Sequence, residues 1–129
     1  MGVQEVDWRG WLTGSRLAAW EISAMFGARF EAPSQTYQLT VDADSYIRSA
    51  DGNLRSLEEV TAEQLRRLTG EIVAVCDYQD QRLVVGLESG AAFEVPSILG
   101  YESWTLGAFG GPTVVCLRDG TVDVWGLGA

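Results

Sequence analysis

The strongest constraint on the fold is a run of short apolar–polar alternations separated by glycine-containing turns. In segment 37–42, Tyr37, Leu39 and Val41 alternate with polar residues, which is the period-two pattern of a half-buried strand. Segment 71–78 has apolar residues at both odd and even positions, and so on both faces of a strand. We therefore expect it to be a central strand. Further strands are expected within 12–23, 28–33, 46–49, 82–96 and 104–125.

The alternation of apolar residues on the two strands predicts the length of the loop in the hairpin 82–96. A two-residue loop at Ser89-Gly90 would turn the two apolar sets to opposite faces. A three-residue loop aligns them and places Gly90 where a G1 bulge needs a positive φ. The expected pairs are Leu83 with Val95, Val85 with Phe93 and Leu87 with Ala91.

The same test favours a different loop in the last hairpin. A two-residue turn at Asp119-Gly120 would gather an aliphatic face, whereas a three-residue loop would set Val115 against Asp123. We therefore expect the shorter turn. Its pairs would be Leu117 with Val122 and Val115 with Val124 on the core face, and Cys116 with Asp123 and Val114 with Trp125 on the other.

One helix is expected, in segment 56–70. Its apolar stripe at helical spacing comprises Leu57, Val60, Leu65 and Leu68. Ser56 with Glu59 and Thr61 with Gln64 both read as capping boxes, and the sequence does not choose between the two starts. Gly70 is placed to end the helix at C′.

These elements predict the α+β class. There is no β–α–β alternation, so we expect a meandering antiparallel sheet, which could curl into a half-barrel, packed with this one amphipathic helix. Residues 12–129 are expected to form a single domain, preceded by a loose N-terminal arm over residues 1–11.

The charge balance excludes several functions. The 18 acidic residues exceed the 9 basic ones, and the net charge of −9 opposes binding to nucleic acid. The chain has no histidine, which removes His-dependent nucleophilic catalysis and most zinc sites. We therefore expect no enzyme activity, no catalytic residue, no metal and no cofactor. No segment has the length or flanks of a membrane span or a signal peptide, so we expect a cytoplasmic protein without membrane contact.

Two sets of residues are candidate binding sites. The first is an acidic face suited to a basic protein partner, and its members are Asp42, Asp44, Asp51, Glu58, Glu59 and Glu63. The second is an apolar pocket for a small ligand, lined by Trp20, Phe93 and Trp104. Trp8 and Trp11 lie outside the strand pattern, and a contact surface or a homodimer interface is an alternative for them.

The C-terminal segment resembles the ending of an uncharacterised domain family of small, mostly actinobacterial proteins. That ending has Tyr-Glu-x-Trp, a glycine-rich turn, Val-Val-Cys, a glycine turn and a final Val-Trp. The matching residues are Tyr101, Glu102, Trp104, Val114, Val115, Cys116, Gly120, Val124 and Trp125. The resemblance supports the expected fold and implies no activity.

The function most consistent with these features is a non-enzymatic protein-binding module. Its sharper form is an immunity or antitoxin-like protein that neutralises a basic toxin, because a small, strongly acidic chain favours a basic partner. The alternatives are a small-ligand carrier built on the apolar pocket and a structural or assembly role.

Overall fold

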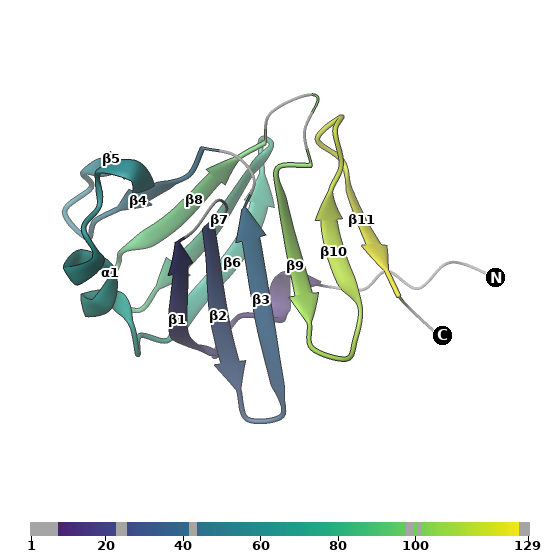
Figure 1. The fold of residues 1–129 in the computed structure, drawn as a ribbon, viewed down its shortest axis with the longest axis horizontal. Coiled ribbons are helices and arrows are strands. Elements are labelled where there is room, and N and C mark those ends of the chain that lie inside the picture. Colours follow the sequence, from purple (N-terminus) through teal and green to yellow (C-terminus); the bar gives the residue numbers. More distant parts are fainter. Residues whose placement is uncertain (1–7, 23–25, 42–43, 98–99, 101, 127–129) are drawn as a thin grey trace.

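The structure is a computed structural model that describes residues 8–22, 26–41, 44–97, 100 and 102–126. Its strands form two antiparallel sheets that pack face to face (Figure 1). Sheet A comprises β1 (Arg16–Ile22), β2 (Phe26–Ala32), β3 (Gln35–Val41), β9 (Trp104–Ala108), β10 (Thr113–Cys116) and β11 (Val122–Trp125), in that order. Sheet B has the order β5 (Leu54–Ser56), β4 (Tyr46–Arg48), β8 (Ala92–Pro96), β7 (Arg82–Leu87) and β6 (Val73–Gln79).

The α+β class is confirmed, with two sheets in place of one curled half-barrel. Sheet A combines the first three and the last three strands, because β3 pairs with β9 and sets Leu39 opposite Leu106. The middle of the chain forms sheet B and the helical turns η2 (Leu57–Glu59) and α1 (Ala62–Leu68). The helical turns lie at one end of the sandwich, beside β5 (Figure 1).

The core lies between the two sheets and is a single cluster. In sheet A, register sets Ala28, Leu39, Leu106 and Val114 in one row across four strands, and each is at most 1% exposed. Burial of one large aliphatic side chain contributes about 1.5–3 kcal/mol relative to exposure. The alternation predicted for β3 is confirmed, since Leu39 and Val41 are buried and Tyr37 is half-buried.

The predicted register of the β7–β8 hairpin is confirmed. Val85 lies opposite Phe93 and Leu83 opposite Val95. The Leu87 amide donates to the Ala91 carbonyl at 2.8 Å, which leaves a three-residue loop that ends at Gly90. Gly90 has φ +98°, the left-handed conformation that glycine adopts without strain.

The predicted register of the β10–β11 hairpin is wrong. Val114 pairs with Val124 and Cys116 with Val122, while Val115 lies opposite Asp123. The loop has three residues, since the Leu117 amide donates to the Thr121 carbonyl at 2.8 Å. Two causes are visible in the structure. Residues 114–117 are all apolar, so either register gives an apolar face. Gly120, at φ +86°, takes the left-handed position of a G1 bulge, which a longer loop requires.

The expectation of a central position for segment 71–78 is also wrong. β6 is an edge strand of sheet B, paired only with β7 among the named strands, and Val75 is 51% exposed on it. Its start is covered by the chain before β1, because the Gly14 amide donates to the Val73 carbonyl at 2.8 Å. Its apolar residues thus belong to an edge that other parts of the chain cover at one end.

The two alternative helix starts are both used, by different elements. Ser56 Oγ accepts from the Glu58 amide and caps η2, whereas Thr61 caps α1 in a complete capping box with Gln64. The α-helix therefore begins after Thr61. Gly70, at φ +98°, follows the C-cap residue Thr69, as expected for C′.

Part of the expected N-terminal arm is ordered against the core. The turn η1 (Trp8–Gly10) lies beside β6, and Trp8 is only 5% exposed. The Trp8 ring packs on Trp104 with centroids 5.4 Å apart. Residues 1–7 lie outside the described residues.

Candidate functional site

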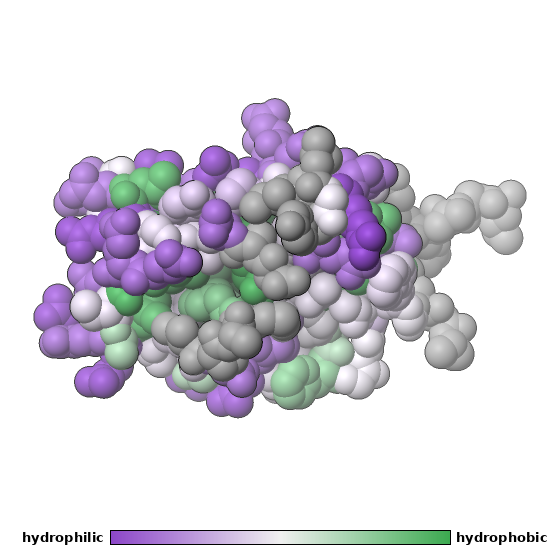
Figure 2. Space-filling model, turned by 45° about the horizontal axis from the view of Figure 1, so that its top comes forward, coloured by the Kyte–Doolittle hydropathy of each residue, from purple (hydrophilic) through white to green (hydrophobic). Residues whose placement is uncertain are grey.

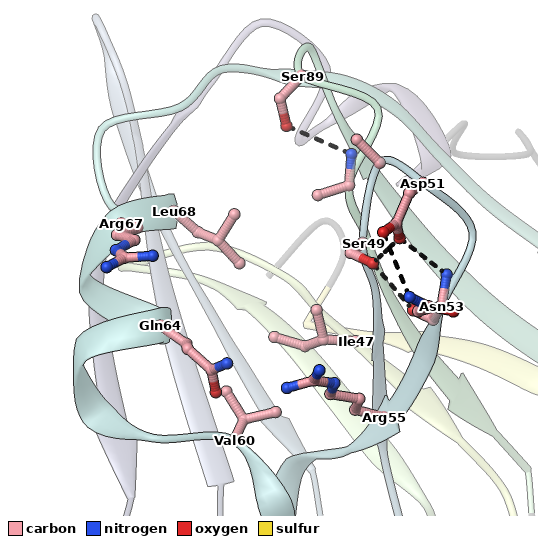
Figure 3. A pocket seen from close by; sticks show the side chains of 12 residues that line it. Ile47, Ser49, Asp51, Asn53, Arg55, Val60, Gln64, Arg67, Leu68 and Ser89 are labelled. Atoms are coloured by element: carbon pink, nitrogen blue, oxygen red, sulfur yellow. Dashed lines mark hydrogen bonds between the residues drawn. The ribbon is translucent and has the colours of Figure 1, made fainter.

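A groove lies between α1 and the β4–β5 hairpin, and it has a volume of about 400 Å³ (Figure 3). Ligand sites commonly occupy about 300–1,000 Å³, so this space suits a small ligand or one partner side chain. At this end of the molecule Figure 2 shows mostly hydrophilic side chains with apolar ones between them. The lining residues are Ile47, Ser49, Ala50, Asp51, Asn53, Arg55, Val60, Gln64, Arg67, Leu68, Ser89 and Ala91.

The walls of the groove are apolar because the predicted stripe of the helical segment faces the sheet. Leu65 is 2% exposed and packs into the core, whereas Val60 and Leu68 are only half-buried and line the groove. Opposite them, Ile47 on β4 is 8% exposed. An apolar wall that stays partly open can receive an apolar group from a ligand.

The β4–β5 turn is held by its own polar groups. Asp51 accepts hydrogen bonds from the Ser49 hydroxyl and from the Asn53 amide, the latter at 3.1 Å. Arg48 Nη1 donates to the Gly52 carbonyl at 3.1 Å. The Ser49 hydroxyl, followed by the Asn53 amide, holds the pKa of Asp51 below its ordinary value. Asp51 therefore lines the groove as an ionised carboxylate whose oxygens point toward the β4–β5 turn.

Two hydrogen-bond donors face the space between the walls. Arg55 lies opposite Ile47 in the β4–β5 register, and its guanidinium lies between Ile47 and Val60, directed toward Gln64 (Figure 3). Gln64 Oε1 accepts the Thr61 amide at 2.9 Å, which orients the side chain and leaves its NH₂ group at the groove. Arg67 is on the rim and pairs with Glu63 at 3.3 Å.

The structure brings together only part of the predicted acidic face. Asp44, Glu58 and Glu59 are exposed and close to one another, because the Leu57 amide donates to the Ser45 carbonyl at 3.0 Å. We name these three residues the acidic cluster. Asp51 lies at the other end of the β4–β5 hairpin, Glu63 pairs with Arg67, and Asp42 lies outside the described residues.

The three residues of the predicted apolar pocket fall into two aromatic groups. Trp20 and Phe93 are in contact, with ring centroids 6.1 Å apart. Trp104 is fully buried and packs instead on Trp8 and on Tyr78, at 5.4 and 5.7 Å. Trp20 also borders a shallow depression beside α1, and its Nε1 donates to the Leu65 carbonyl at 2.8 Å.

The tryptophans considered for a dimer interface are largely engaged within the chain. Trp8 is buried in the core, as described above. Trp11 is half-buried and stacks on Tyr37 with centroids 5.8 Å apart. Trp125, at 49% exposed, is the most open of the five tryptophans, and its Nε1 donates to Asp123 at 2.8 Å.

The far end of the sandwich is closed by a different group of residues, which we name the closed end: Trp8, Tyr78, Ser97, Trp104 and Cys116. The Tyr78 hydroxyl donates to the Gly120 carbonyl at 2.6 Å and lies 2.7 Å from Ser97 Oγ. Ser97 Oγ is 3.2 Å from Cys116 Sγ. Burial raises the pKa of Tyr78, which disfavours its ionised form.

Neither cysteine has an activating environment among the described residues. Cys116 lies opposite Val122, so the predicted neighbour Asp123 is not its partner. Burial, with a smaller effect of Asp77, raises the pKa of Cys76 to about 12. Both thiols are free and buried. Within the described part of the chain, no group of three or more His, Cys, Asp or Glu residues could hold a metal ion.

The outer face of sheet B carries a charged cluster that was not predicted from the sequence. Glu94 accepts from Arg48 Nε at 2.7 Å and from Arg82 Nη1 at 2.9 Å. Its side chain is 7% exposed. Burial by itself would raise the pKa of Glu94, but the two arginines outweigh it and hold the pKa below its ordinary value. The strand register would have indicated this cluster, because it sets Arg48, Arg82 and Glu94 on the same face of sheet B.

Comparison with known proteins gives a family without an assigned activity. No curated protein and no solved structure matches the chain. Among the described residues, no helix has the length and apolar character that a membrane crossing requires. The model of a family of unknown function, DUF6188, matches residues 8–126. This confirms the expected membership of an uncharacterised family: the chain belongs to the DUF6188 family.

Proposed function

We propose that the chain is a non-enzymatic protein-binding module whose partner is basic. The observation that supports this most directly is the acidic cluster. None of its three carboxylates forms an ion pair with a described residue, so their charge is available to a partner. The surplus of nine negative charges over the whole chain would also accelerate association with a basic surface.

The sharper form of the proposal is an immunity or antitoxin-like protein that acts in the cytoplasm and neutralises a basic toxin. A partner of this kind would set lysine or arginine side chains against Asp44, Glu58 and Glu59. Charge pairs at the rim of an interface mainly affect the association rate and its salt dependence. Complex formation should therefore weaken as the salt concentration rises.

The test is affinity capture with two triple variants that lose the same charge. D44N/E58Q/E59Q neutralises the acidic cluster, and E21Q/D80N/E102Q neutralises three exposed acids elsewhere. At about 0.05 M salt, where screening is weak, the wild type and the control variant should retain the same basic protein, and the cluster variant should not. Equal retention by both variants, or retention of no basic protein, would contradict the proposal.

The immunity role has its own test. The captured partner should arrest growth when it is expressed alone and should be harmless when it is expressed with the wild-type chain. Co-expression with D44N/E58Q/E59Q should restore the arrest. If the partner is harmless when expressed alone, the immunity role is contradicted, whereas the proposal of a protein-binding module is not.

A further inference from the structure

We infer that the groove between α1 and the β4–β5 hairpin binds a carboxylate carried on a short aliphatic body. This site is separate from the acidic cluster, and the inference does not depend on a basic protein partner. Its elements are a guanidinium and an amide NH₂ group at the mouth, with apolar walls behind them.

The positive group at the mouth is Arg55. It forms no ion pair or hydrogen bond with any described residue, whereas five other arginines lie within 3.5 Å of a carboxylate. Its charge still acts on Asp51 at longer range, because the pKa of that carboxyl is lowered mainly by the Ser49 hydroxyl and to a minor extent by Arg55. Its guanidinium lies between Ile47 and Val60 in the view of Figure 3. An arginine offers five donors in a planar fork that matches a carboxylate in a bidentate manner.

The second donor is Gln64. The capping box engages its oxygen with the Thr61 amide, so the amide group cannot turn over without loss of that hydrogen bond. The NH₂ group is therefore the part presented to the groove. Together with Arg55 it provides donors from two opposite elements, α1 and β5, toward one point (Figure 3).

The other charged groups of the groove set its selectivity. Arg67 on the rim is neutralised in part by Glu63 at 3.3 Å. Asp51 is the carboxylate that lines the groove, and it is turned toward Ser49 and Asn53 in its own loop. A ligand carboxylate is therefore favoured beside Arg55 and Gln64, and the negative charge of Asp51 disfavours it beside the β4–β5 turn.

The apolar walls define the rest of the ligand. Ile47, Val60, Leu68 and Ala91 line the groove with branched or small aliphatic groups. A volume of about 400 Å³ accommodates a body of a few carbon atoms. Two sources offer this chemistry: a free short-chain acid, and the C-terminal leucine or valine of another polypeptide.

The experiment compares two carboxylates with their neutral amides. Isocaproate represents the free acid, and acetyl-glycyl-leucine represents a polypeptide C-terminus; isocaproamide and acetyl-glycyl-leucinamide are the matched controls. Each is titrated into the labelled protein while the backbone amide signals of residues 47, 55, 64 and 68 are followed by NMR. We expect at least one acid to shift these signals with a dissociation constant on the order of 1 mM, and its amide to bind at least about tenfold more weakly, since a charged hydrogen bond is lost.

Variants assign the effect to Arg55. R55Q should weaken binding of the acid by about tenfold, whereas R66Q, which removes the same charge from a residue of α1 outside the groove, should leave it unchanged. Binding of only one acid would show whether the ligand is a free acid or a polypeptide C-terminus, and it would support the proposed site. Three results would overturn the inference: no shift with either acid, equal binding of an acid and its amide, or undiminished binding by R55Q. The comparison of acid with amide uses the wild-type protein and stands even if a variant does not fold.

Discussion

The groove end and the closed end of the molecule use their polar side chains in opposite ways. At the closed end, Tyr78, Ser97 and Cys116 contact one another and the Tyr78 hydroxyl donates to the Gly120 carbonyl, so these polar groups are used within the fold. At the groove end, Arg55 and the Gln64 NH₂ group are directed into open space. The difference teaches that polar side chains beside an apolar surface can serve either the fold or a ligand, and that only donors without a partner inside the fold are available to a ligand.

One atom of the closed end departs from this rule. Among the described residues, the buried Nε1–H of Trp104 has no hydrogen-bond acceptor. An unsatisfied buried donor costs about 1–3 kcal/mol. The packing of the fully buried indole against Trp8 and Tyr78 must offset this penalty.

The largest effect should come from removal of that packing. Trp104→Ala should lower the free energy of unfolding by about 3–5 kcal/mol, because the indole is 0% exposed and its loss leaves a cavity. Trp125→Ala, at a ring that is 49% exposed, should cost less than about 1 kcal/mol. Urea unfolding measures both. Similar values for the two variants would mean that the closed end is not tightly packed.

The second-largest effect should come from Glu94, which connects Arg48, at the start of the β4–β5 turn, to Arg82 in sheet B. Glu94→Gln should cost about 1–2 kcal/mol at pH 7, because it leaves Arg48 and Arg82 without their buried counter-charge. The estimate lies below the range for fully buried pairs, since the two arginine side chains are 42% and 41% exposed. Glu31→Gln is the control, because its pair with Arg16 spans 3.5 Å at the surface.

The same variant predicts a pH dependence. The folded-state pKa of Glu94 is lowered, so its stabilisation is fully present above the unfolded pKa of about 4.3 and is lost as the pH falls through the folded value. The difference in unfolding free energy between wild type and Glu94→Gln should therefore shrink below about pH 4. A difference that stays constant from neutral to acidic pH would show that Glu94 acts through its shape and not its charge.

A smaller effect is expected from the closed end's hydrogen bonds. Tyr78→Phe keeps the ring against Trp104 but removes the donor to the Gly120 carbonyl, and it should cost about 1 kcal/mol. Tyr37→Phe preserves the stack on Trp11 and should be nearly neutral. Thermal unfolding of the two variants side by side gives the comparison, and equal midpoints would argue against a stabilising role of the Tyr78 hydroxyl.

The smallest effect should be at the groove. Arg55→Gln should change the free energy of unfolding by less than about 0.5 kcal/mol, because no described residue bonds to the guanidinium. The measurement is again urea unfolding. A loss as large as that of Tyr78→Phe would show that the fold itself uses Arg55, and the contrast between the two ends would fail.

The sequence predicts local structure well where the alternatives differ strongly. In the β7–β8 hairpin only one loop length aligns the apolar residues, and that loop is observed. In the β10–β11 hairpin residues 114–117 are all apolar, so either loop length sets Val122 and Val124 opposite apolar side chains. There the conformation of Gly120 and the hydrogen bonds of Asp119 with Thr121 decide the loop.

Features that depend on distant pairings could not be predicted from the sequence. The division into two sheets follows from the pairing of β3 with β9. The edge position of β6 follows from the pairing of β8 with β4, which extends sheet B on the side away from β6. The groove likewise exists only because β5 and α1 face each other across the end of sheet B. The predicted acidic face joined acids that are near one another in the sequence, and the fold separates Asp51 from Asp44, Glu58 and Glu59.

The pairing of β3 with β9 also constrains how the protein can be made on the ribosome. The strands of sheet B are contiguous in the chain, whereas sheet A needs β1–β3 to wait for β9–β11. During translation the edge of β3 has no partner until more than sixty further residues have been added. An uncovered strand edge is a template for pairing with other chains. A synthesis stalled after β8 should therefore yield a species that aggregates or recruits a chaperone.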